Sequence, residues 1–140
     1  MSTIKVTNIQ DTSGGNSSTS EQIAQGRAKA WVNFQGDGTV SINDDFNVSS
    51  ITDNGQSYVV NFSTAFANAN YAATGMVANT NDAYSTDYAG ETRGGCTLQV
   101  KGTTAPTASA LEVETVYHAN STSNGGFAEL DNVYVIVFGD

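Results

Sequence analysis

Apolar and polar side chains alternate along most of the chain from residue 28 onward. Ala28, Ala30, Val32 and Phe34 would share one face of an extended segment, with Trp31 on the other face. A period of two residues is typical of a β-strand that has one buried face. Similar patterns predict further strands near residues 40–48, 58–62, 71–78, 97–101, 111–118 and 133–138.

Turn-forming residues separate these segments. Asp53-Asn54-Gly55 predicts a tight hairpin, because Asn and Gly tolerate the positive φ that such a turn requires. The strand before this turn is expected to have one apolar face, which Asp44 interrupts. The residues of this face are Val40, Ile42, Phe46 and Val48. About seven strands separated by turns predict an all-β fold, either an antiparallel β-sandwich or a jelly-roll-like head.

The N-terminal part of the chain follows a different pattern. Ile4–Ile9 is expected to form a short strand or an extended arm, and a polar run follows it. This pattern divides the chain into an arm, residues 1–27, and a head, residues 28–140.

One short helix is predicted within the arm. Ser18 with Glu21 fits a capping box, and Gly26 fits a C-terminal cap, so the helix should lie within Thr19–Gln25. A helix of about two turns is too short to be stable alone and should dock on another surface.

The charge balance excludes two classes of partner. The sequence holds 14 acidic and 5 basic residues, which gives a net charge of −9. A protein that binds nucleic acid needs a basic surface to displace counterions from phosphates, and an anionic membrane repels a chain of this charge. We therefore expect neither nucleic-acid binding nor membrane insertion.

Cysteine usage and the N-terminus bear on location. Cys96 is the only cysteine, so the chain can form no internal disulfide bond and no cysteine zinc site. Met1–Lys5 lacks the apolar stretch of a secretion signal, and no segment has the roughly 20 apolar residues of a membrane helix. The expected location is a cytosol, which the protein would leave by lysis.

Motifs that carry catalysis are scarce. His118 is the only histidine, and no sequence context indicates that it activates Cys96. Glu112 and Glu114 share one side of a predicted strand, as the paired acids of some glycosidases do, but solvated strand faces produce this pattern more often. We expect no enzyme activity, no catalytic residue and no cofactor.

The segment 79–95 is the candidate ligand-binding loop. Tyr84 and Tyr88 offer aromatic faces, while Asp87 and Arg93 offer hydrogen-bonding groups, a combination that suits a sugar or a protein surface. Alternatively, the two tyrosines pack the loop onto its own sheet or into a subunit contact. Oxygen donors in this loop would suit calcium, but their spacing misses the EF-hand template, so no metal ligand is assigned among Asn79, Asn81, Asp82, Asp87 and Glu91.

Trp31 is a candidate contact residue because it should face away from the core. A large indole on an outer surface is unusual unless something covers it. A neighbouring subunit or the short helix would provide that cover, and both alternatives stay open.

Several runs of sequence resemble a module of the tail-fibre-like virion proteins of marine tailed bacteriophages, of the cyanophage and pelagiphage type. The similarity covers about the first half of the chain, and beyond Tyr71 only the rhythm of strands matches. The similar runs are Ile4–Gly14, Gly26–Phe34, Phe46–Gly55 and Tyr58–Tyr71.

This resemblance implies a structural protein of the virion, made in the host cytoplasm and released by lysis. Such fibres are generally homotrimers, held to other virion proteins by an N-terminal end, with a β-rich head that contacts a host glycan or protein. Ile4, Val6, Ile9 and Trp31 are the expected subunit-interface residues. Tail fibres normally carry a long shaft and this sequence has none, which leaves open a head fibre or a capsid decoration (cement) protein.

Overall fold

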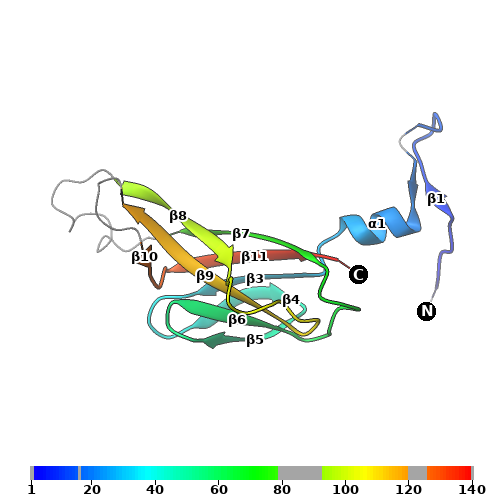
Figure 1. Cartoon of the computed structure of the whole chain (residues 1–140). Coiled ribbons are helices and arrows are strands. Elements are labelled where there is room, and N and C mark those ends of the chain that lie inside the picture. Colours follow the sequence, from blue (N-terminus) through cyan, green and yellow to red (C-terminus); the bar gives the residue numbers. More distant parts are fainter. Residues whose placement is uncertain (1, 16, 79–92, 120–125, 140) are drawn as a thin grey trace.

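The computed structural model describes residues 2–15, 17–78, 93–119 and 126–139, and for residues 93–95 and 118–119 it describes the backbone alone. Two antiparallel sheets pack into an elongated β-sandwich, the head, and an N-terminal arm extends from one end of it (Figure 1). Within the described residues a single helix is present, and it belongs to the arm. The predicted all-β sandwich is confirmed.

The first sheet contains four strands in the order β4-β3-β11-β7. Its two central strands come from distant parts of the sequence and pair from Ala30 opposite Val137 to Gln35 opposite Asn132. The sheet edges are therefore β4 and β7. The strands span Ala30–Gln35 (β3), Ser41–Phe46 (β4), Ala72–Ala78 (β7) and Asn132–Phe138 (β11).

The second sheet is built around β9, the longest strand. One edge of β9 pairs with β6, which pairs in turn with β5, while β8 and the short β10 pair with the later part of β9. The strands span Val48–Asp53 (β5), Ser57–Phe62 (β6), Arg93–Val100 (β8), Ala110–Ala119 (β9) and Gly126–Phe127 (β10).

The core lies between the two sheets and follows the predicted alternation. Ala30, Val32 and Phe34 of β3 are at most 2% exposed, and Tyr58 of β6 meets the Phe34 ring edge-on with the ring centroids 5.2 Å apart. Burying aliphatic and aromatic side chains from both sheets is the main source of stability in such a sandwich. The other core residues are Val48, Val60, Phe62, Phe66, Leu111, Val113, Val133, Val135 and Val137.

The predicted hairpin at Asp53-Asn54-Gly55 is also confirmed. The Asn54 N–H donates to the carbonyl of Ser57 at 2.9 Å, and Gly55 adopts a φ of +81°. The Gly55 N–H donates to Asp53 Oδ1 at 2.8 Å, so the aspartate holds the turn through a local hydrogen bond.

Gly36, directly after β3, lies where three segments approach closely. Its carbonyl accepts a hydrogen bond from Tyr58 Oη at 2.8 Å, and its N–H donates to the carbonyl of Asp131 at 2.9 Å. A Cβ at this position would lie 2.6 Å from the carbonyl oxygen of Leu130 and 2.8 Å from Tyr58 Oη. Burial raises the pKa of Tyr58, which keeps its hydroxyl protonated and able to donate to Gly36.

The prediction for β4 is wrong at Phe46. Asn33 pairs with Asp44, but the next residue of β3, Phe34, pairs with Ile42, so Asn43 is an extra residue in β4. Such a β-bulge reverses the alternation of side chains beyond it. Phe46 therefore faces away from the core and is 53% exposed, whereas Ile42 packs against the core.

Asn47 carries the chain from the first sheet to the second. It lies between the end of β4 and the start of β5 with a φ of +59°, a conformation that Asn adopts more readily than most residues. Its Nδ2 donates to the carbonyls of Lys29 and Thr64, each at 3.1 Å, and its Oδ1 accepts from the Thr64 N–H at 2.8 Å. One side chain thus connects three segments at the crossing point.

The arm contains a short ladder and the helix. β1 (Asn8–Ile9) pairs with β2 (Ser18–Thr19), and α1 spans Ser20–Gly26. Of the strand or arm expected over Ile4–Ile9, only the last two residues are in a strand. No residue of α1 is buried.

The helix caps differ from the prediction. The capping box is formed one residue later than expected, by Thr19 and Gln22: the Gln22 N–H donates to Thr19 Oγ1 at 3.1 Å, and the Thr19 N–H donates to Gln22 Oε1 at 2.9 Å. Ser18 is instead paired in β2. Gly26 ends the helix without a positive φ, and Arg27 continues in an extended conformation, so the predicted glycine cap is wrong.

Candidate functional site

The outward-facing side of the first sheet carries a contiguous group of apolar side chains. Trp31 pairs with Phe46 on one side and with Ile136 on the other, and Tyr134 pairs with Met76. Residues that are paired across neighbouring strands project from the same face. Met76 is 71% exposed, Phe46 53%, Ile136 39% and Tyr134 38%, and Trp31 is partly buried. We call these five side chains the outer face.

An exposed apolar group of this kind is typical of an interaction surface. Trp31 lies on the side opposite the core, as predicted, because both of its neighbours in β3 are buried. Sequence reasoning missed the other members of the outer face. The alternation in β11 could have indicated Tyr134 and Ile136, whereas the bulge hides Phe46 from any periodic pattern.

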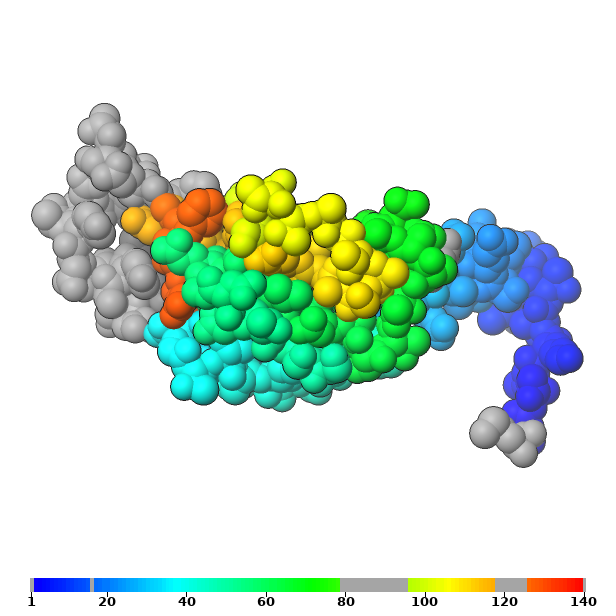
Figure 2. All heavy atoms as spheres, turned by 60° about the horizontal axis from the view of Figure 1, so that its bottom comes forward, coloured from blue at the N-terminus to red at the C-terminus, as the bar shows by residue number. Residues whose placement is uncertain are grey.

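The arm presents a second set of exposed apolar residues. Ile4, Val6 and Ile9 are 88%, 49% and 57% exposed, and Ile23 of α1 is 41% exposed. The arm stands away from the head (Figure 2). Its helix α1 and the extended residues after this helix connect the arm to the head. The arm therefore buries few of its own apolar side chains.

A polar cluster lies on the outward side of the second sheet. Glu112 Oε1 accepts from Lys101 Nζ at 2.8 Å, from Ser57 Oγ at 2.9 Å and from Asn54 Nδ2 at 3.2 Å. Glu112 is 8% exposed, and its ion pair with Lys101 connects the segment after β8 to the middle of the sheet. No local sequence pattern signals this cluster, because its members belong to separate strands and turns.

The cluster favours the ionised form of Glu112. Hydrogen bonds from Lys101, Thr104, Ser57 and Asn54 outweigh the opposing effect of burial and lower the pKa of Glu112 to about 2. A carboxyl with this pKa holds no proton near neutral pH and has none to donate as a general acid. Glu114, the other member of the paired carboxylates, accepts a hydrogen bond from Gln99 Nε2 at 3.0 Å.

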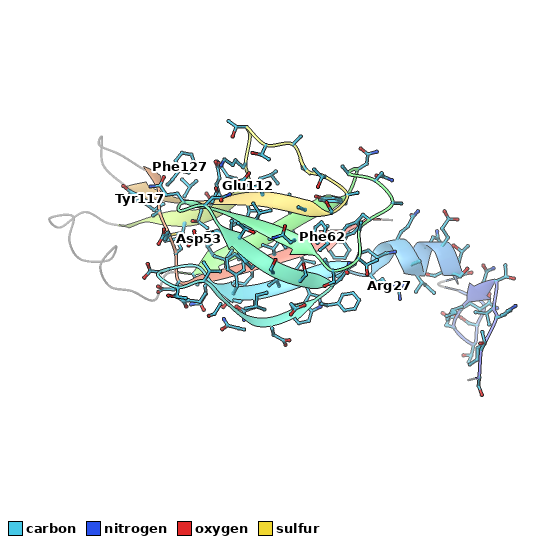
Figure 3. All side chains as sticks on the ribbon, turned by 90° about the horizontal axis from the view of Figure 1, so that it is seen from below. Arg27, Asp53, Phe62, Glu112, Tyr117 and Phe127 are labelled. Atoms are coloured by element: carbon cyan, nitrogen blue, oxygen red, sulfur yellow. The ribbon has the colours of Figure 1, made fainter. Side chains whose placement is uncertain are left out.

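An open hollow of about 460 Å³ lies beside this cluster. Figure 3 shows Glu112, Phe127, Tyr117 and Asp53 gathered toward the end of the head that is far from Arg27 and the arm. The residues that line the hollow are mainly polar, and they are Asn54, Gly55, Gln56, Ser57, Lys101, Glu114, Phe127 and Glu129.

Most of the predicted ligand-binding loop lies outside the described residues. Tyr84, Asp87 and Tyr88 are among these, as are all the oxygen donors considered for calcium. Arg93 begins β8, and its backbone pairs with Ala119 of β9. β7 ends and β8 begins at the end of the head farthest from the arm (Figure 1).

Cys96 is a remaining candidate for chemistry. It pairs across the sheet with Tyr117, and burial raises the pKa of its thiol, which disfavours the reactive thiolate. In the part of the chain that the structure describes, no three His, Cys, Asp or Glu residues are placed to hold a metal ion together. Its one helix is far too short to cross a membrane.

No protein-family model matches the sequence, and neither the curated proteins nor the solved structures include a significant match to this chain.

Proposed function

We propose that this protein is a structural component of a bacteriophage virion, a short fibre-like appendage with a receptor-binding type of β head. In this role the arm attaches the protein to other virion proteins, and the far end of the head contacts a glycan or protein on the host surface. Three copies form the appendage. The sequence resemblance to tail-fibre-like proteins motivates the proposal.

The observation that best supports this function is that the two ends of the molecule differ. The arm lies at one end of the elongated head, and β7 ends and β8 begins at the opposite end (Figure 1). A binding protein gains from this arrangement, because a rigid sheet scaffold presents the connections between strands away from the point of attachment. Candidate ligand contacts Tyr84, Asp87 and Tyr88 fall in the connection between β7 and β8.

A capsid decoration or cement protein is the second candidate. The outer face of the first sheet supports it, because a protein that holds neighbouring subunits together works through broad apolar contacts. In that case the main partners would be capsid subunits rather than a host receptor.

Immunogold electron microscopy of purified phage particles distinguishes these roles. An antibody against the head should label the tail region if the protein is a fibre-like appendage, and the capsid shell if it is a decoration protein. A protein that is absent from purified particles, by labelling and by mass spectrometry, would contradict both.

Ligand binding is tested separately with the double substitution Tyr84→Ala and Tyr88→Ala. Cell-surface binding by the purified protein should be lost, while the mass of the assembly and its thermal midpoint stay nearly unchanged. Loss of the assembly or of the fold would instead assign the two tyrosines a structural role. Light scattering of the unmodified protein should give about three times the 14.6 kDa chain mass.

A further inference from the structure

We propose that the N-terminal arm of one copy of this protein binds across the outer face of a second copy. Two surfaces of the described residues expose several apolar side chains each. One is the arm, with Ile4, Val6 and Ile9, and the other is the outer face around Trp31 and Phe46. Bringing them together removes both from water, which is the driving force for most protein association.

Charge favours the arm over other occupants. The arm, residues 1–27, carries two basic and two acidic side chains, whereas the head, residues 28–140, carries three basic and twelve acidic ones. The exposed carboxylates of Asp44 and Asp45 lie on β4, beside Phe46. The segment Ile4–Ile9 has Lys5 as its one charged side chain and is therefore attracted to the acidic head of another copy, while two heads placed face to face repel each other.

The geometry at the base of the arm fits an exchange between copies. Phe46 belongs to the outer face and also lines a hollow of about 370 Å³, together with Arg27 and Lys29 at the base of the arm. The outer face thus continues to the point where the chain's own arm leaves the head. Because that arm runs away from the head, it leaves this surface open to the arm of a neighbour (Figures 1 and 2).

Purified full-length protein tests the proposal without reference to any virion role. Analytical ultracentrifugation of the unmodified protein should show an assembly larger than the 14.6 kDa chain. Phe46→Lys should reduce it to monomers, because burying a charged side chain within the apolar contact is costly. Phe127→Lys is the matched control: Phe127 is 47% exposed, close to the 53% of Phe46, but it lies on the other sheet. This control should assemble normally.

The arm is tested in the same way. Val6→Asp with Ile9→Asp should also give monomers, whereas Thr12→Asp with Ser17→Asp adds the same charge at exposed polar positions of the arm and should leave assembly intact. Circular dichroism should show the same strand content in all variants. An arm variant that assembles like the unmodified protein would eliminate the arm as the occupant and favour a contact between two outer faces.

Mixing the two disrupted proteins is the decisive step. The Phe46→Lys protein still has an intact arm, and the Val6→Asp/Ile9→Asp protein still has an intact outer face. An equimolar mixture should therefore form a complex of about twice the chain mass. This complex should require about tenfold higher protein concentration than the unmodified assembly does, because one contact replaces several. A mixture that stays monomeric, an unmodified protein that is a monomer, or a Phe127→Lys protein that fails to assemble would each overturn the proposal.

Discussion

Replacing Glu112 with Gln should change how the stability of the protein depends on pH. Glu112 is almost fully buried and accepts hydrogen bonds from Lys101, Ser57 and Asn54. Gln has nearly the same shape, so the substitution removes the charge and the ion pair with little change in packing. The perturbation therefore isolates the electrostatic contribution of the cluster.

The size of the effect follows from the pKa of Glu112, which is lowered from 4.5 to about 2 in the folded protein. At about 1.4 kcal/mol for each pKa unit, the ionised form contributes on the order of 3 kcal/mol to the free energy of unfolding at neutral pH. Because the folded pKa is the lower one, this stabilisation is complete above about pH 5. It is lost as the pH falls toward 2, where the folded protein also binds the proton.

Urea unfolding of both proteins between pH 7 and pH 2 provides the measurement. The Gln variant should be less stable by about 2–3 kcal/mol at pH 7, and the two stability curves should converge as the pH falls from about 5 to about 2. Glu114→Gln is the control: Glu114 is partly exposed and should change stability by less than about 1 kcal/mol. Curves for Glu112→Gln and the unmodified protein that stay parallel throughout would refute the reasoning.

Two further substitutions test how the head is held together. Gly36→Ala should lower the free energy of unfolding by about 2 kcal/mol or more, because the new Cβ would be too close to a carbonyl oxygen, whereas Gly102→Ala, with nothing within 4 Å, should be nearly neutral in the same denaturation assay. Asn47→Asp keeps the acceptor but loses both hydrogen bonds that the amide donates, so the thermal midpoint should fall with a loss of about 1–2 kcal/mol. Asn68→Asp, where only the side-chain oxygen is used, should leave the midpoint unchanged.

Much of the fold could be predicted because its strands are defined by local alternation. The buried faces of β3, β6 and β11 follow directly from side chains two residues apart, and the hairpin at Asp53-Asn54-Gly55 follows from the backbone preferences of Asn and Gly. These signals depend on neighbouring residues alone. The helix was also predicted, although its cap is displaced by one residue because Ser18 pairs with β1.

Features that depend on distant residues could not be predicted. The position of Phe46 depends on a bulge that exists only in the pairing of β4 with β3. The acceptor Glu112 and its donor Ser57 are 55 residues apart, and only the order of strands brings them together. Trp31 was identified from its own strand, but the size of the outer face depends on which strands flank it.

The position of β11 has a consequence for how the protein folds during synthesis. β11 lies between β3 and β7, and Val137 pairs with Ala30, more than 100 residues earlier in the chain. The first sheet therefore cannot close until residues through Phe138 have left the ribosome. Until then β3 can pair only with β4 in this sheet. Its apolar residues stay exposed to solvent, and such exposure favours aggregation. Contacts between such distant residues also slow folding, so we expect this small domain to fold in milliseconds to seconds rather than microseconds.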